Sequence, residues 1–206
     1  MRQVIRNWVD DFDLAVREMQ EYGLKAISID DQAARGHVAL GWSRIVTGQH
    51  DSALESLQRA VEVNPSFGQG YVYLGLAQMF CGQTEAARAS ADTAMRLSPQ
   101  DPMMSWMFDC KGLAYQVERD YSAALKHFSR AAELAPKDPI TRNNLVATLG
   151  LMGRIDEGRK HLEIVERYMP NMSLEVLRRT YPFKNPEDQA LFFDGLKRVR
   201  EAVETS

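Results

Sequence analysis

The stretch from Gly68 to Pro99 reads GQGYVYLGLAQMFCGQTEAARASADTAMRLSP, and its spacing predicts two short helices joined by a turn. One face of the first helix carries residues at i, i+3, i+4 and i+7, namely Tyr71, Leu74, Gly75 and Gln78. The second helix repeats this spacing with small residues at Ala87, Ala91 and Ala94. Gly82 lies between them, where a chain that leaves a helix often needs a positive φ, and Pro99 ends the second helix because proline cannot continue one. Small residues at facing positions let two backbones approach closely, so the stretch predicts an antiparallel helical hairpin.

The same landmarks recur along the chain. The first helix of each unit has a compact residue, at Gly41, Gly75, Gly112 and Val146. Small residues follow at Ala53, Ala87, Ala124 and Gly158, then compact residues at Ala60, Ala94, Ala131 and Val165, and finally Pro65, Pro99, Pro136 and Pro170. The units are spaced by 34, 37 and 34 residues. A helix–turn–helix period of 34 residues with these landmarks resembles the tetratricopeptide repeat (TPR) family over about residues 31–170.

The resemblance implies an all-α fold, a TPR solenoid of about four helix–turn–helix repeats. We expect the array to cover residues 31–170, with units at 34–65, 68–99, 103–136 and 139–170. Residues 1–30 are expected to form an N-terminal helix or a degenerate half-repeat, and residues 171–206 a C-terminal helical cap, because a repeat array needs its last unit covered. Asn185-Pro186-Glu187-Asp188 predicts the start of that cap helix.

Three of the turns between paired helices are predicted to use glycine, at Gly48, Gly82 and Gly153. Arg119 stands at the equivalent place in the third unit, so we expect that turn to be strained or differently built. Asp51, Thr84 and Ser173 are predicted to cap the helices that follow them.

Composition and motifs favour a non-catalytic protein. The net charge is −3 with both signs interspersed, which gives no support for binding nucleic acid or a membrane. The chain has no phosphate-binding glycine loop, its four histidines are scattered, and its cysteines, Cys81 and Cys110, fit no metal spacing. Asp10, Asp11 and Asp13 form an acidic cluster that we interpret as a solvated helix face. We therefore expect no enzyme activity, catalytic residue, metal or cofactor, two reduced cysteines, and a cytoplasmic location.

The resemblance to TPR proteins implies that the first helices line a concave groove. Projected onto this chain, the groove carries Arg35, Val38, Trp42, Gln69, Val72, Leu76, Phe80, Trp106, Asp109 and Asn143. Chaperone-binding TPR proteins hold a terminal carboxylate with lysine and asparagine, but those places are mostly apolar here. This composition favours an amphipathic helix or an extended segment of a protein partner. The alternative is that Trp42, Phe80 and Trp106 pack against the chain's own helices.

A second resemblance comes from the C-terminal stretch RRTYPFKNPEDQALFFDGLKRV. Its Tyr181-Pro182-Phe183 through Gly195-Leu196-Lys197 motif resembles the tail of bacterial class III adenylate/guanylate cyclases, in which a TPR region follows the catalytic domain. The resemblance implies a regulatory region for signal transduction, whose partner could be an attached catalytic domain or a second copy in a homodimer. The alternatives are the TPR tail of a winged-helix transcription regulator and a stand-alone TPR scaffold.

Overall fold

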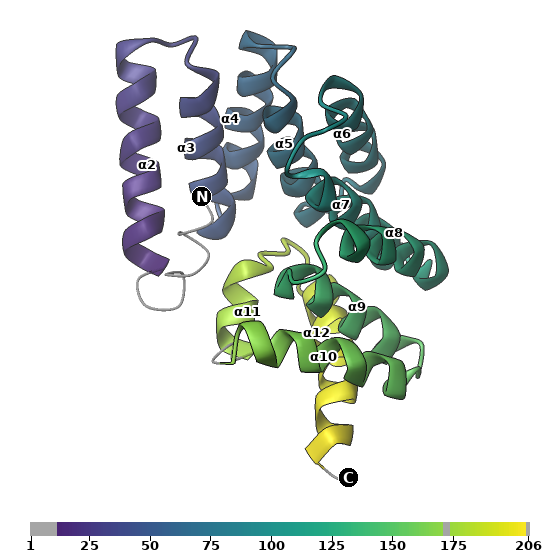
Figure 1. The fold of residues 1–206 in the computed structure, drawn as a ribbon. Coiled ribbons are helices and arrows are strands. Elements are labelled where there is room, and N and C mark those ends of the chain that lie inside the picture. The colour runs from purple at the N-terminus through teal and green to yellow at the C-terminus, as the bar shows by residue number, and fades with distance from the viewer. Residues whose placement is uncertain (1–11, 171–173, 205–206) are drawn as a thin grey trace.

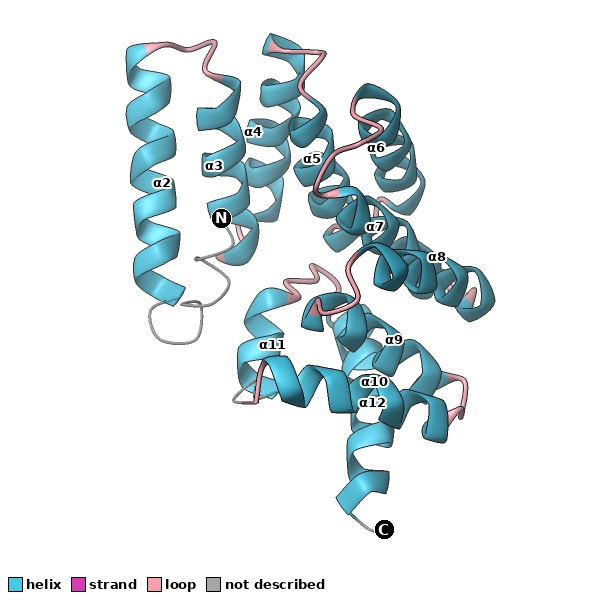
Figure 2. Cartoon of the chain, viewed as in Figure 1, coloured by secondary structure: helices cyan, strands magenta, loops and turns pink. Residues whose placement is uncertain are grey.

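A computed structural model describes residues 12–170 and 174–204, and this part of the chain consists of helices and connecting loops (Figures 1 and 2). The helices are α2 (Phe12–Ile29), α3 (Ala34–Val46), α4 (His50–Val63), α5 (Gly68–Phe80), α6 (Thr84–Leu97), α7 (Met104–Val117), α8 (Tyr121–Leu134), α9 (Pro139–Leu151), α10 (Ile155–Tyr168), α11 (Leu174–Thr180) and α12 (Pro186–Glu204). Four successive hairpins, α3/α4, α5/α6, α7/α8 and α9/α10, follow one another around a curved array (Figure 1). The predicted all-α TPR solenoid is confirmed.

The hairpins close where the repeat places its small residues. Ala53, Ala87 and Ala124 are fully buried on the second helices. A Cβ added to Gly75 would lie 3.1 Å from the Ala87 carbonyl oxygen, and one added to Gly112 would overlap the Phe128 ring. The compact landmarks therefore mark positions where a neighbouring helix leaves no room for a side chain.

The turns show why three of them use glycine. Gly48, Gly82 and Gly153 have φ values of +78°, +77° and +72°, in the left-handed region. Arg119 adopts a φ of 66° at the equivalent place, so the strain predicted for the third turn is confirmed.

Two of the predicted helix caps are wrong. The N–H of Gln49 donates to the Arg44 carbonyl (2.8 Å), and this tight closure lets α4 begin at His50, so Asp51 lies inside its first turn. Gln83 bonds to Gln78 in the same way, and Thr84 is already helical. The predicted cap at Ser173 lies outside the described residues.

The N-terminal α2 is one continuous helix that packs on α3 through Gly23 and Gly36. A Cβ on Gly23 would lie 2.8 Å from the Leu40 nitrogen, so the two backbones are in close contact. Of the acidic cluster, Asp10 and Asp11 lie outside the described residues, and Asp13 is in the first turn of α2.

The last helix, α12, packs against α9 and α10 (Figure 1). Its start matches the sequence-based expectation, because the Asn185 side chain accepts a hydrogen bond from the Glu187 N–H (3.0 Å). Gly150 of α9 and Gly195 of α12 lie back to back, and a Cβ on either would overlap the backbone of the other helix. Phe192, Leu196 and Val199 are buried on the face that α12 turns toward the array.

Candidate functional site

The first helices of three successive units carry a row of three aromatic rings. The rings of Trp42 (α3) and Tyr73 (α5) have centroids 5.2 Å apart, and those of Tyr73 and Trp106 (α7) are 6.4 Å apart, both edge to face. Tyr73 is buried between the two tryptophans, which are half-buried. Gln69 is also half-buried, and Arg35 is exposed. We call Trp42, Tyr73 and Trp106 the aromatic row.

The other predicted groove residues are covered by the chain itself. They are Val38, Val72, Leu76, Phe80, Asp109 and Asn143, each less than 10% exposed. The ring of Phe80 meets that of Phe183 edge to face, with centroids 5.3 Å apart. This part of the groove therefore holds intramolecular contacts, whereas the four less buried residues, Arg35, Trp42, Gln69 and Trp106, keep surface in contact with solvent.

Asp109 is the centre of a buried polar network. Its carboxylate accepts hydrogen bonds from the Thr141 hydroxyl (2.6 Å) and the Asn144 amide (3.0 Å), both on α9. The Tyr181 hydroxyl in turn donates to Asn144 Oδ1 (2.6 Å). Burial raises the pKa of Asp109 to about 7, and the hydrogen bonds from Thr141 and Asn144 oppose this rise only in part. The network therefore ties the third and fourth units to the C-terminal segment.

The segment Tyr181–Lys184, which we call the strap, connects α11 to α12 and lies across the array. Its main chain is held by two other elements: the Lys184 N–H donates to the Phe80 carbonyl (2.8 Å), and Nε2 of His50 donates to the Pro182 carbonyl (2.7 Å). The Lys184 ammonium pairs with Asp51 (2.6 Å). The strap thus contacts the first and second units, while Tyr181 reaches the fourth.

The strap's two rings are buried among aromatic side chains. Tyr181 stacks on Phe192 of α12 with centroids 4.2 Å apart, and it is 1% exposed. Phe183 is 9% exposed and packs between Phe80 and the other two rings. The two aromatic side chains of the Tyr181-Pro182-Phe183 motif are therefore part of the protein's interior.

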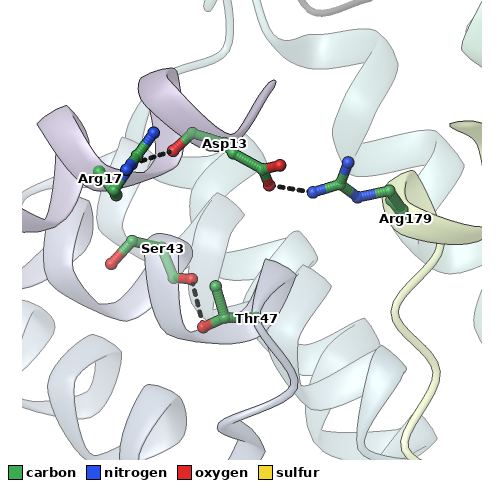
Figure 3. A network of polar contacts seen from close by, with 5 residues as sticks. All are labelled: Asp13, Arg17, Ser43, Thr47 and Arg179. Atoms are coloured by element: carbon green, nitrogen blue, oxygen red, sulfur yellow. Dashed lines mark hydrogen bonds and ion pairs between the residues drawn. The ribbon is translucent and has the colours of Figure 1, made fainter. Parts of the chain in front are cut away.

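A second contact joins the C-terminal segment to the N-terminal helix. In Figure 3, Arg179 of α11 points toward Asp13 at the start of α2 and forms an ion pair with it. The Arg179 guanidinium also lies 4.4 Å from the centroid of the Phe12 ring. In the same view, Arg17 donates to the Asp13 carbonyl (3.2 Å) and Thr47 to the Ser43 carbonyl (2.9 Å). Residues of α11 and the strap thus touch elements at both ends of the array.

Sequence reasoning missed His50, Asp51, Thr141, Asn144 and the strap as members of this region. His50 is the first residue of α4 and binds the strap's backbone. The available signal was the dense polar run of α9, Thr141 to Asn144, on a helix otherwise rich in apolar residues.

The side chains of the described residues form no group of the kind that binds metal ions. No cluster of three histidine, cysteine or acidic side chains there could hold a metal ion. Cys81 and Cys110 are free thiols, and burial raises the pKa of both. Within the same residues, none of the helices has the length and apolar character needed to cross a bilayer.

Comparison with known proteins agrees with the repeat. Residues 38–102 match a family model described as tetratricopeptide repeat. The fold is similar to TTC0263, a thermophilic TPR protein in Thermus thermophilus (20% identity, 87% of this chain and 96% of that chain, TM-score 0.69). It is also similar to PilW, a type IV pilus biogenesis factor (15%, 98% and 96%, TM-score 0.68), and to YrrB, a TPR protein with an unusual peptide-binding site (17%, 89% and 95%, TM-score 0.53). No curated protein matches this chain. The family match covers about a third of the chain, and the similarity to the solved structures shows that the fold is that of a TPR array.

Proposed function

We propose that this chain is a non-catalytic protein-interaction module that binds a segment of a partner protein along its concave face. The observation that carries the proposal is the strap. The array already holds a non-helical piece of polypeptide by main-chain hydrogen bonds to Phe80 and His50 and by inserted aromatic rings. Main-chain bonds combined with side-chain pockets are how proteins recognise extended peptides.

The aromatic row is the part of this face that we assign to the partner. Trp42 and Trp106 are half-buried and flank Tyr73, so their positions are fixed before any partner arrives. Rigid aromatic side chains of this kind are common anchors of binding energy, because they bury much area at little entropic cost. The partner is an amphipathic helix or an extended segment, and Arg35 and Gln69 border the row as polar contacts.

The parent protein is a finer part of the proposal. The segment 181–197 resembles the tail of class III cyclases. On this basis we propose that the chain is the regulatory region of a cyclase-type signalling protein and that the catalytic domain of that protein is the partner. No matched family or structure described above is a cyclase or a winged-helix regulator, so this assignment depends on the motif alone. The reading frame upstream of Met1 distinguishes a cyclase, a regulator and a stand-alone scaffold directly.

Site-specific photo-crosslinking tests the binding face. A photo-reactive amino acid is placed at Gln69, beside the aromatic row, and in a matched control at the exposed Arg130 of α8. We expect a discrete partner to be crosslinked in cells from position 69 and not from position 130. Equal crosslinking from both positions, or none from position 69, would contradict the assignment of the concave face.

A further inference from the structure

The strap's last two residues occupy a small, well-defined site on the array. Phe183 packs on Phe80 at the end of α5, and Lys184 pairs with Asp51 in the first turn of α4. Between these side chains, the Lys184 N–H satisfies the Phe80 carbonyl. This carbonyl is at the C-terminal end of α5, where helix carbonyls lack an intrahelical partner. We call Phe80, Asp51 and His50 the strap pocket.

The strap pocket has the features of a peptide site. The Phe80 ring offers an apolar surface for one side chain, and the Asp51 carboxylate pairs with the next. For the main chain, the Phe80 carbonyl accepts from one N–H, and the His50 ring donates to one carbonyl. These groups fit an aromatic residue followed by a basic residue in an irregular, non-helical segment. Two of the four contacts are made to backbone atoms of the strap and so do not depend on which chain supplies the segment.

The contacts at Lys184 are weaker than those at Tyr181. The side chains of Lys184 and Asp51 are 47% and 81% exposed, and ion pairs with this exposure contribute little. Tyr181, by contrast, is buried by Phe192 and bonded to Asn144. Local opening therefore begins at Lys184, where the contacts are exposed, and release of Phe183 also requires its ring to separate from Phe80 and Phe192 while Tyr181 holds the segment in place.

We propose that the strap pocket is a second recognition site, which binds a non-helical partner segment with an aromatic residue followed by lysine or arginine in place of Phe183–Lys184. The strap then acts as an internal competitor that lowers the affinity for such segments. This inference depends on the proposed function as an interaction module, but it concerns a different part of the array. The crosslinking experiment at Gln69 tests the aromatic row, whereas the experiment below tests the pocket alone.

The test uses the full chain with Phe183→Ala and Lys184→Ala, which we call the emptied variant: it removes the strap's two side-chain contacts, leaves only its two main-chain bonds, and keeps Phe80, Asp51 and His50. The probe is a fluorescent peptide with the sequence of residues 178–187, RRTYPFKNPE, measured by anisotropy. We expect the emptied variant to bind the probe at least about tenfold more tightly than the parent chain does, because the competitor has been removed. Replacing phenylalanine by alanine in the probe should weaken binding about thirtyfold, as for loss of an aromatic anchor. A folded variant that does not bind the probe, or that binds the alanine probe equally well, would overturn the proposal.

A measurement on the parent chain keeps the proposal testable if the double variant does not fold. Hydrogen exchange at the Lys184 amide reports the opening of its bond to the Phe80 carbonyl. We expect this amide to exchange at least about a hundredfold faster than the buried amides of α5, since the pocket must open without global unfolding. Exchange of the Lys184 amide at the rate of global unfolding would mean that the strap cannot leave, and the proposal would be wrong.

Discussion

Replacing the buried carboxylate of Asp109 by asparagine should change the pH dependence of folding. The folded pKa of Asp109 is about 7, above its ordinary value of 3.8, because burial disfavours the charged form. Between these two pH values the folded chain holds a proton that the unfolded chain has lost. The stability contributed by this proton is therefore present at low pH and is lost as the pH rises toward 7.

The size of the effect follows from that difference. The parent chain loses about 1.4 kcal/mol of stability per pH unit through Asp109 until the pH reaches the folded pKa of about 7. Raising the pH from 5 to 8 should therefore cost it about 3 kcal/mol. Asparagine resembles the protonated acid in shape, and it can still accept from Asn144 and bond to the Thr141 hydroxyl. The stability advantage of Asp109→Asn over the parent should thus be larger at pH 8 than at pH 5 by about 3 kcal/mol.

Urea unfolding followed by circular dichroism at both pH values measures this difference. Asp92→Asn is the matched control: Asp92 makes an ion pair with Lys111 but has a side chain 59% exposed, so its effect should stay below about 1 kcal/mol. If the stability difference between Asp109→Asn and the parent is the same at pH 5 and pH 8, Asp109 is ionised at both, and the burial argument is refuted.

Three further changes test the packing by thermal or urea unfolding. Gly150→Ala should cost about 3 kcal/mol or more, because the added Cβ overlaps the backbone of Gly195. The control Ser129→Ala, at an exposed position, should cost under about 0.5 kcal/mol, and equal stability of the two variants would refute the close contact of α9 and α12. Ala87→Glu should cost several kcal/mol, about 3 or more, because Ala87 is fully buried, and Gln83→Glu in the adjacent turn should have little effect; equal melting temperatures would contradict the repeat assignment. Deleting residues 184–206 should lower the melting temperature or cause aggregation, since it uncovers the surface under Phe192, Leu196 and Val199; an equally stable monomer would mean that α12 is a detachable tail.

The fold could be predicted because equivalent positions in each repeat make the same backbone contacts, so the residues that permit these contacts recur along the sequence. The compact residues Gly75 and Gly112 recur where the neighbouring helix leaves no space for a side chain, and positive φ values recur at Gly48, Gly82 and Gly153. The same comparison between units identified Arg119 as a strained turn, because it departs from the glycine of the other units. Helix starts were less accurate, since the turn geometry places the caps at Gln49 and Gln83, just before the residues whose side chains are suited to capping.

The candidate site could be predicted only in part. The period places Trp42, Phe80 and Asp109 on one face, but it does not show what covers that face. The strap lies after Pro170, where the period ends, and it contacts His50, 132 residues before Pro182. Its position depends on side-chain fit among Phe80, Tyr181 and Phe192 across distant units, and no local pattern encodes such contacts.

The aromatic row is the surface that we propose as the anchor for a protein partner. The most direct measurement is the yield of the partner crosslinked from Gln69 in Trp42→Ala/Trp106→Ala, relative to the chain with both tryptophans. The side chains of Trp42 and Trp106 are half-buried, and each meets the Tyr73 ring edge to face. Because neither is fully buried, the variant should keep its helical circular dichroism spectrum. Loss of two anchors should reduce the crosslinked yield by about thirtyfold or more. An unchanged yield from a folded variant would contradict the claim.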